Sequence, residues 1–497
     1  MSDTTAGQAA QPGHITGFGT KPYRSYVLIA LTLVYTLNFI DRTVITVVAQ
    51  PIIDTFSLSD AQWGVLTGWP FALFYAGMGI PIAMWADRGN RVKIITFCII
   101  IWSLMTVFCG LASGFLWLLL FRVGVGIGEA GCTPPANSLI GDYYPAKSRA
   151  NAIGIYSMGV TLGGVLAQLF GGTIASIKGE DMGAWIQSFG MGGLFSGLDW
   201  AEVQGWRFAF ILVGAPGLIV ALIIWLTMRE PPRGHSDEKS TTPETKAGFA
   251  EAFKEFGKKP TFWTLSLGAA FVAFAGYGLI SFQAPFLMRV HGVSVHEAAV
   301  RYGAPLAAVA AFGTFLGGFL SERLSGRFPS VAAWLPSVGL TIAVPCYVAA
   351  FLSPTLPMAF ALWIVAAIGH YAYLGAQYTV SVAIVSPKSR ATTVSVMLLI
   401  VSLIGNGIGP FFTGLMSTSF MKGIIRSEGL DTSFHRFDLC AGKIAEIGPE
   451  GPALCSAYSE GLRQSMIATV LFLLVAAVFY FLAGRTFARD RWSANSN

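Results

Sequence analysis

Charged residues are scarce in this chain of 497 residues: Asp, Glu, Lys and Arg together make up 12% of it, about half of their usual share in soluble domains. Apolar residues make up 54% and gather in runs of about 20 residues or more, the length at which a helix crosses roughly 30 Å of hydrocarbon. This composition argues against a soluble enzyme, a nucleic-acid-binding protein and a disordered adaptor. The runs are also too long for the strands of an outer-membrane barrel. We therefore expect an all-α membrane protein.

Cysteine is rare as well, and the six cysteines show neither a CxxC motif nor the His/Cys spacing of a metal site. We expect no metal and no other cofactor. P-loop, GxSxG and HExxH motifs are missing too, so we expect no catalytic residues and no enzymatic activity. Cys440 and Cys455 share one long hydrophilic loop, where they form a disulfide if that loop faces an oxidising compartment, with two free thiols as the alternative.

Polar, glycine and proline breaks divide the apolar runs into twelve candidate transmembrane helices. They cover about 26–50, 62–85, 93–112, 116–141, 151–176, 206–228, 262–288, 303–321, 331–352, 356–384, 391–418 and 464–485. The short loops after spans 2, 4, 8 and 10 carry two or three Lys or Arg residues each, whereas those after spans 1, 3 and 9 carry none. Because basic residues are retained in the cytoplasm, we expect a multi-pass protein of the cell (inner) membrane with both termini cytoplasmic. The polar first 20 residues do not resemble a cleavable signal peptide.

The predicted organisation is two helical halves joined by a linker. It comprises a cytoplasmic tail (1–25), a six-helix bundle (26–228), a cytoplasmic linker (229–261) with a short amphipathic segment, a second six-helix bundle (262–485) and a second cytoplasmic tail (486–497). The halves repeat one another, since PAKSRA after span 4 returns as PKSRA after span 10, and DRGNR after span 2 returns as ERLSGR after span 8. Both offsets are close to half of the chain, as in transporters built from two parallel six-helix repeats.

These repeated loops resemble those of the major facilitator superfamily. The superfamily signature between spans 2 and 3 is G-x-x-x-D-R-x-G-R-[KR], which this chain matches at Asp87, Arg88 and Arg91, with Ala83 in place of the first glycine and the Gly-Asn order inverted. Spaced glycines after Arg122 in span 4, a glycine-rich span 5 and a Gly-Trp-Arg run before span 6 are similar to the same superfamily. The resemblance implies transport by alternating access.

The run Asn-Phe-Ile-Asp-Arg at residues 38–42, together with Glu129, resembles the Spinster branch of that superfamily. Members of this branch are linked to the movement of sphingosine 1-phosphate and lysophospholipids. The resemblance therefore implies a secondary active transporter of an amphipathic anionic lipid. A small organic anion such as a sugar acid is an alternative cargo, and a non-transporting receptor or sensor on the same fold is an alternative of another class.

Four ionisable residues, Asp41, Arg42, Arg122 and Glu129, fall inside predicted spans. A charge at bilayer depth costs several kcal/mol unless it meets a partner or a wet cavity, so we expect all four to face the space between the halves. We hypothesise that Arg42 and Arg122, with Asn38 on the same helix face as Arg42, bind an anionic head group.

In this hypothesis Asp41 and Glu129 compete for the arginines until protons neutralise them. Protons and the anion then bind with positive coupling, which is the sign of symport. A permanent buried charge network that holds spans 1 and 4 together is the alternative.

The second half offers fewer candidates. Tyr371 is a polar candidate for substrate binding, Phe274 is a candidate contact for an acyl tail, and His370 could bind protons near neutral pH. For Phe274 the alternative is ordinary packing, and for His370 it is a hydrogen bond to a neighbouring helix.

Loop charges in both halves suggest a gate latch that pairs with another helix end in only one of two states. The candidate latch residues are Asp87, Arg88, Arg91, Glu322 and Arg323. The acid before the arginine in both halves favours a latch over a loop that only sets orientation, because cytoplasmic retention needs no acid. The expected partners are the anion, protons and the lipid bilayer, with no nucleic acid, and a monomer is the expected form.

Overall fold

The computed structural model describes residues 17–190, 197, 199–236, 248–325, 327–328, 330–440 and 442–493. Most of the predicted N-terminal tail, residues 237–247 of the predicted linker and the last four residues lie outside this described part. Within it, twelve helical segments are long and apolar enough to cross a membrane. The predicted all-α fold class with twelve spans is therefore confirmed.

The first half contains spans 1 to 6. They are α1 (Lys21–Val47), α3 (Asp60–Thr67) with α4 (Trp69–Arg88), α5 (Arg91–Gly110), α6 (Phe115–Glu129) with α7 (Thr133–Tyr143), α8 (Ala146–Leu166) with η1 (Ala167–Gly171) and α9 (Gly172–Ala175), and α11 (Gly205–Thr227). The short helices α2 (Ala49–Phe56) and α10 (Gly179–Ser188) lie between spans.

The second half contains spans 7 to 12. They are α13 (Pro260–His291), η3 (Glu297–Gly303) with α14 (Ala304–Ser325), α15 (Val331–Leu352), α16 (Leu356–Tyr371) with α17 (Tyr373–Ala383), η4 (Pro387–Ser389) with α18 (Arg390–Val401), η5 (Ser402–Ile408) and α19 (Gly409–Ser427), and α20 (Gly451–Asp490). The linker contributes α12 (Phe249–Gly257), and the loop after α19 contributes η6 (Phe437–Cys440) and η7 (Ile444–Ile447).

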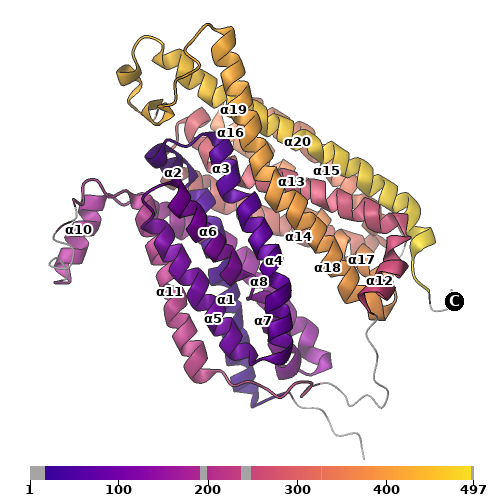
Figure 1. Cartoon of the computed structure of the whole chain (residues 1–497). Helices are drawn as coiled ribbons and strands as arrows, with labels where there is room; N and C mark the ends of the chain where they lie inside the picture. The colour runs from indigo at the N-terminus through magenta and orange to yellow at the C-terminus, as the bar shows by residue number, and fades with distance from the viewer. Residues whose placement is uncertain are drawn as a thin grey trace, which may run out of the picture.

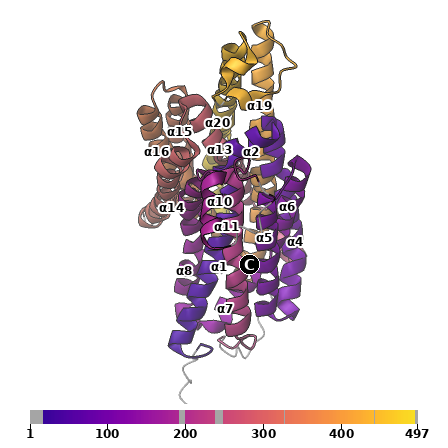
Figure 2. The ribbon, with the colours of Figure 1, turned by 90° about the vertical axis from the view of Figure 1, so that its left-hand side faces the viewer.

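The two halves lie side by side, the first in indigo to magenta and the second in rose to yellow (Figure 1). An even number of crossings returns the chain to the side on which it began. The start of α1, the helix α12 and the end of α20 therefore share one end of the bundle, which we name the linker end. The opposite end, which we name the far end, carries α2 and the long loop between α19 and α20 (Figures 1 and 2).

Close backbone packing joins the halves toward the far end, where α3 crosses α19. A Cβ atom on Gly414 would lie 2.0 Å from the carbonyl oxygen of Asp60, and a Cβ on Gly64 would lie 2.4 Å from that of Pro410. Only residues without a side chain allow the two helix backbones to approach this closely. The far end is therefore closed by helix-to-helix contact.

The linker end is packed less tightly along α8. The buried residues of α8 are Ala152, Tyr156, Gly159 and Gly163, which form a single stripe. Tyr156 of this stripe stacks on Tyr35 of α1 at 4.4 Å between ring centroids. The remaining faces of α8 are partly or fully exposed, so α8 packs mainly against its own half over this length.

The long far-end loop is cross-linked. Cys440 and Cys455 form a disulfide with their Cα atoms 5.5 Å apart. Of the two alternatives that the sequence left open for these cysteines, the structure has the disulfide.

Candidate functional site

The structure brings together the four ionisable residues that the sequence placed inside spans 1 and 4. Arg42 Nε donates a hydrogen bond of 2.8 Å to Glu129 Oε2, and Arg42 Nη2 also lies 2.8 Å from that oxygen. Asp41 interacts electrostatically with Glu129 and Arg122, and Arg122 interacts with Glu129 in turn. These four residues of α1 and α6 form one group, which we name the charged cluster.

Most of the charged cluster is buried. Asp41 and Glu129 are each 1% exposed, Arg122 is 3% exposed, and the neighbouring Asn38 is 2% exposed. The Arg42 side chain is 17% exposed, the largest fraction among these five residues. Arg42 is therefore the group through which the cluster reaches the surface.

Several polar atoms of the cluster are not paired. Glu129 Oε1, Asp41 Oδ1, Arg122 Nε and Asn38 Nδ2 have no hydrogen-bond partner among the described residues. An unpaired buried polar atom is costly, and proteins satisfy nearly all of them. The cluster thus holds hydrogen-bonding capacity that the described part of the protein does not use.

Aromatic rings surround the partly buried Arg42. The Arg42 Cζ atom lies 4.5 Å from the ring centroid of Tyr75, 5.1 Å from that of Phe39 and 5.2 Å from that of Phe71. The Arg122 Cζ atom lies 4.9 Å from the same Phe71 centroid. Phe71 and Tyr75 were not among the site residues predicted from the sequence. Their i, i+4 spacing on span 2 is a weak signal for two rings on one helix face.

Two tyrosines of the second half add to the aromatic residues around Arg42. Tyr277 of α13 interacts electrostatically with Arg42, and Tyr371, which the sequence predicted as a substrate contact, interacts with Tyr277. Tyr277 was missed because a single tyrosine within an apolar span carries little signal by itself. A polar group of the second half therefore lies within electrostatic range of the arginine of the first.

Phe274 and His370 both make packing contacts within the second half. Phe274 is 5% exposed and contacts the rings of Phe412 and Phe472 at 5.2 and 4.9 Å between centroids. His370 is 1% exposed, and its Nδ1 lies 3.1 Å from the hydroxyl of Tyr347 on α15. These contacts are the ones expected under the packing alternatives. Roles for Phe274 in tail binding and for His370 in proton binding stay predictions.

The candidate latch residues divide into an exposed set and a buried one. Asp87, Arg88, Glu322 and Arg323 are exposed at the linker end. Arg91 is 1% exposed and forms ion pairs within its own half, with Asp142 and, at 2.6 Å, with Glu230. Arg91 thus anchors the first residues of the linker to the first half. A gating role for all five residues stays a prediction.

A different ion pair joins the halves at the far end. Arg289 at the end of α13 donates two hydrogen bonds of 2.8 Å to the carboxylate of Asp60 at the start of α3. Gln50 accepts from Arg289 at 2.7 Å, and Ser417 of α19 donates to Asp60. Asp60 and Arg289 were not predicted as site residues because both stand at span ends, where an isolated charge is ordinary.

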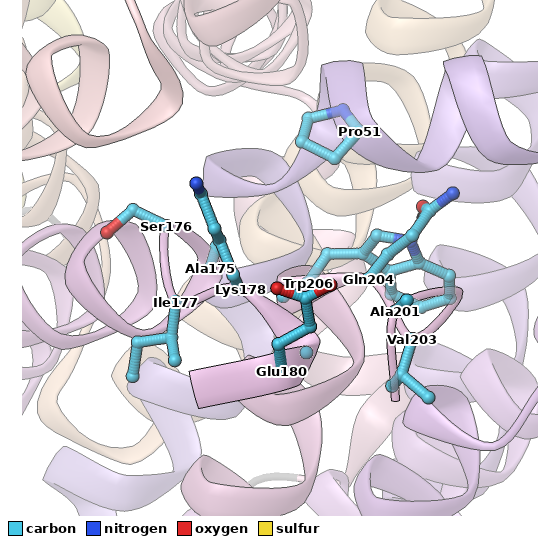
Figure 3. A pocket seen from close by; sticks show the side chains of 12 residues that line it. Pro51, Ala175, Ser176, Ile177, Lys178, Glu180, Ala201, Val203, Gln204 and Trp206 are labelled. Carbon is cyan, nitrogen blue, oxygen red and sulfur yellow. Dashed lines mark hydrogen bonds between the residues drawn. The ribbon is translucent and has the colours of Figure 1, made fainter. Parts of the chain in front are cut away.

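A cavity of about 550 Å³ lies in the first half near the far end (Figure 3). The side chains of Ser176, Lys178, Glu180 and Gln204 surround it, and Trp206 forms part of its wall. None of the predicted site residues lines it. We assign it no role in the candidate site.

Two repeated six-helix halves, with ion pairs buried within and between them, define a membrane transporter of the two-repeat class. Residues 31–410 match the Major Facilitator Superfamily. The chain belongs to this superfamily and, within it, to the Spinster type. The predicted superfamily and branch are thereby confirmed, and the family consists of transporters and not of enzymes, as expected.

One similar solved structure is that of a bacterial homologue of the human lysosomal transporter Spinster in an inward-facing and unoccupied conformation. It is 76% identical, the match covers 96% of this chain and 100% of that one, and the TM-score is 0.92. An MFS-type efflux pump of Mycolicibacterium smegmatis is 31% identical over 80% of this chain and 86% of its own length. Protein spinster homolog 1 of Xenopus tropicalis is 24% identical over 81% of this chain and 74% of its own length.

Proposed function

We propose that the chain is a proton-coupled secondary active transporter of an amphipathic anionic lipid, of the lysophospholipid or sphingosine 1-phosphate kind, that works by alternating access. The observation that carries the proposal is the Arg42–Glu129 ion pair. It is accessible through Arg42, yet it leaves Glu129 Oε1 without a partner among the described residues. In an ion pair with a purely structural role, the remaining polar atoms would be expected to form hydrogen bonds as well.

The coupling follows from competition for Arg42. A guanidinium stays charged at every physiological pH, whereas a buried carboxylate can accept a proton. A phosphate that binds the Nε and Nη2 side of Arg42 displaces Glu129, and protonation of Glu129 removes the charge that holds this side of the guanidinium. Asp41 also interacts electrostatically with Arg122. Proton and anion therefore bind cooperatively at this site.

Two features support an amphipathic cargo. The guanidinium of Arg42 lies among the rings of Phe39, Phe71 and Tyr75, so its surroundings combine one charge with a large apolar surface. Such surroundings suit a charged head group attached to a hydrocarbon tail. The resemblance of residues 38–42 and Glu129 to the Spinster branch supports the same class of cargo.

Orientation and access state also belong to the proposal. The disulfide in the far-end loop is stable only in an oxidising compartment, which supports a far end that faces outward and termini that face the cytoplasm. Basic loops at the linker end support the same orientation. The closed far end, together with the exposed charges Asp87, Arg88, Glu322 and Arg323 at the linker end, supports an inward-facing state.

The test is pH-dependent flux in sealed vesicles. The purified chain is reconstituted, and transport of a lysophospholipid and of a sugar acid is measured from about pH 5.5 to 8. We expect lysophospholipid flux to depend on pH, and Glu129→Gln to flatten that dependence while the protein remains folded. The control is Glu297→Gln, since Glu297 is a carboxylate near the far end that bonds only Ser294 among the described residues.

An unchanged pH profile in Glu129→Gln contradicts the coupling mechanism. Flux of the sugar acid without flux of the lysophospholipid contradicts the lipid cargo. Lipid binding without flux in either direction identifies a receptor and contradicts transport.

A further inference from the structure

A groove of about 460 Å³ lies between α15 and α20 in the second half, and it is separate from the charged cluster. Because α15 begins at the linker end and α20 ends there, the groove runs from Ser330 and Arg485 near that end to Val338 and Phe481 deeper in the span. Gly484 lets α15 and α20 approach each other, since a Cβ at that position would lie 2.7 Å from Trp334 Cβ.

The groove opens onto a surface that has to meet lipid tails. Val338 is 45% exposed and Phe481 is 47% exposed, and further along the same helices Ile342 and Val478 are 53% and 58% exposed. On a chain that spans a membrane, such a continuous apolar stripe is covered by hydrocarbon. A lipid tail can therefore enter the groove from the bilayer without leaving an apolar environment.

The linker end of the groove lies at the depth of lipid head groups. Lys259, just after α12, donates a hydrogen bond of 3.1 Å to the backbone oxygen of Asp490, the last residue of α20. The helix α12 exposes Phe249 and Phe253 beside Lys254, the pattern of a helix that lies in the membrane interface. Arg485 precedes Asp490 by five residues, which is about 7.5 Å along the helix axis.

The polar groups at this end are free to bind an anion. The Arg485 Cζ atom lies 4.6 Å from the ring centroid of Phe481, a contact that uses one face of the guanidinium and none of its N–H groups. Among the described residues, no hydrogen bond or ion pair engages those N–H groups. Ser330 stands at the N-cap of α15 without capping it through its side chain, so its hydroxyl is also available.

We propose that this groove binds an anionic phospholipid of the leaflet at the linker end, which is the cytoplasmic leaflet if the proposed orientation holds. The phosphate lies at Arg485 and Ser330, and one acyl chain follows Trp334, Val338 and Phe481 between the two helices. A basic side chain at the head-group depth of a groove between spans is the arrangement that recognises anionic lipids. The bound lipid is a structural partner and not the transported cargo, because the site shares no residue with the charged cluster.

The test measures lipid retention by the purified full-length protein. The protein is taken from nanodiscs that contain equal amounts of dioleoylphosphatidylglycerol and dioleoylphosphatidylcholine, and the retained lipids are counted by native mass spectrometry. We expect the unchanged chain to retain phosphatidylglycerol preferentially. Arg485→Gln should lower this preference about fivefold, the effect of losing one cation at an anionic surface, and Arg485→Lys should keep most of it.

Two more variants make the result specific. Val338→Trp fills the groove from an exposed position and should lower phosphatidylglycerol retention without touching Arg485. Arg491→Gln removes the same charge just past the end of α20, outside the groove, and should retain phosphatidylglycerol as the unchanged chain does. The proposal is overturned if Arg485→Gln or Val338→Trp retains phosphatidylglycerol normally, or if Arg491→Gln loses as much as Arg485→Gln. No transport measurement enters this test, so its outcome is independent of the proposed function.

Discussion

Arg289 and Asp60 stand in different halves of the chain and form a bidentate ion pair, with both guanidinium-to-carboxylate distances at 2.8 Å. Both side chains are nearly excluded from solvent, at 4% and 3% exposure. Removing one member of a buried pair leaves the other charge uncompensated, at a cost of about 3–5 kcal/mol. The pair is therefore a strong local determinant of far-end closure.

Asp60→Asn should shift the protein away from the far-end-closed conformation. The amide keeps one acceptor for Arg289 but leaves its charge uncompensated, and this cost falls only on the closed state. The change is measured by electron spin resonance between labels at Ser57 and His296, which lie exposed at the far ends of the two halves. We expect the distance distribution to gain a longer component.

The matched control for this experiment is Asp438→Asn. Asp438 also pairs with an arginine at the far end, but Arg436 belongs to the same loop and is half exposed. The control should leave the distances unchanged. An Asp60→Asn distribution identical to that of the control would show that the interhalf pair does not hold the far end closed.

Gly414→Ala should destabilise the same closed end by steric means. The added methyl group would lie 2.0 Å from the Asp60 carbonyl oxygen, so α3 and α19 must separate, at a cost of about 1–3 kcal/mol. We expect a lower Tm and the same longer distances. Gly423→Ala on the same helix meets open space and serves as the control. Equal Tm values for the two variants would argue against tight packing at Gly414.

Glu255→Gln should loosen the attachment of the linker helix α12 to the second half. Glu255 accepts hydrogen bonds from Ser389 at 2.6 Å and from the Ser386 hydroxyl at 2.9 Å. Loss of the carboxylate charge weakens both, so hydrogen exchange across 249–257 should become about tenfold faster. Glu251→Gln, an exposed change on the same helix, is the control. Exchange that is equally slow in both variants would mean that Glu255 does not hold the helix.

The same contact predicts that the attachment of α12 to the second half does not change with pH in the physiological range. Burial raises the pKa of Glu255, but the hydrogen bonds from Ser389 and Ser386 outweigh burial and leave the pKa below its ordinary value. A carboxyl group whose pKa is lowered on folding stabilises the folded state at any pH above its ordinary pKa. This stabilisation is lost only as the pH falls through the lowered pKa. The protection factors of the α12 amides, which are their exchange rates corrected for the intrinsic rate at each pH, should therefore stay constant between pH 5.5 and 8. A break within that range would contradict the assignment.

Removing the disulfide should destabilise the far-end loop. Cys440 and Cys455 are separated by 15 residues, and a loop of that size corresponds to about 3 kcal/mol in the chain-entropy estimate. The double Ser variant should therefore have a lower Tm.

After mild reduction of whole cells, a membrane-impermeant maleimide should label both cysteines of the unchanged chain. Labelling that requires permeabilised cells would place the far end inside and reverse the proposed orientation.

The fold class and the charged cluster could be predicted because each depends on local chemistry. An apolar run of about 20 residues is stable in a bilayer as a membrane-spanning helix, and charges within such runs need a protein partner. The seven-residue spacing of Arg122 and Glu129 fixed a shared helix face, and the ion pair of Glu129 with Arg42 lies on that face.

Contacts between distant residues could not be predicted in this way. Asp60 and Arg289 are 229 positions apart, and nothing in either neighbourhood indicates the other. The same holds for Tyr277 beside Arg42, and for Glu255 at the loop before α18. Arg91 was selected from its motif as a latch residue. Its contacts with Asp142 and Glu230 could not be predicted, because they depend on how separate segments of the chain meet.

The sequence by itself determined what must cross the membrane, in how many passes, and which side chains carry charge at mid-depth, because hydropathy and helix periodicity act within one segment. Only the tertiary structure decided that the far end is closed by Asp60, Arg289 and facing glycines, that Arg42 is the accessible member of the charged cluster, and that Arg485 borders a groove. These features arise where two helices pack, and packing depends on the shapes of both surfaces at once.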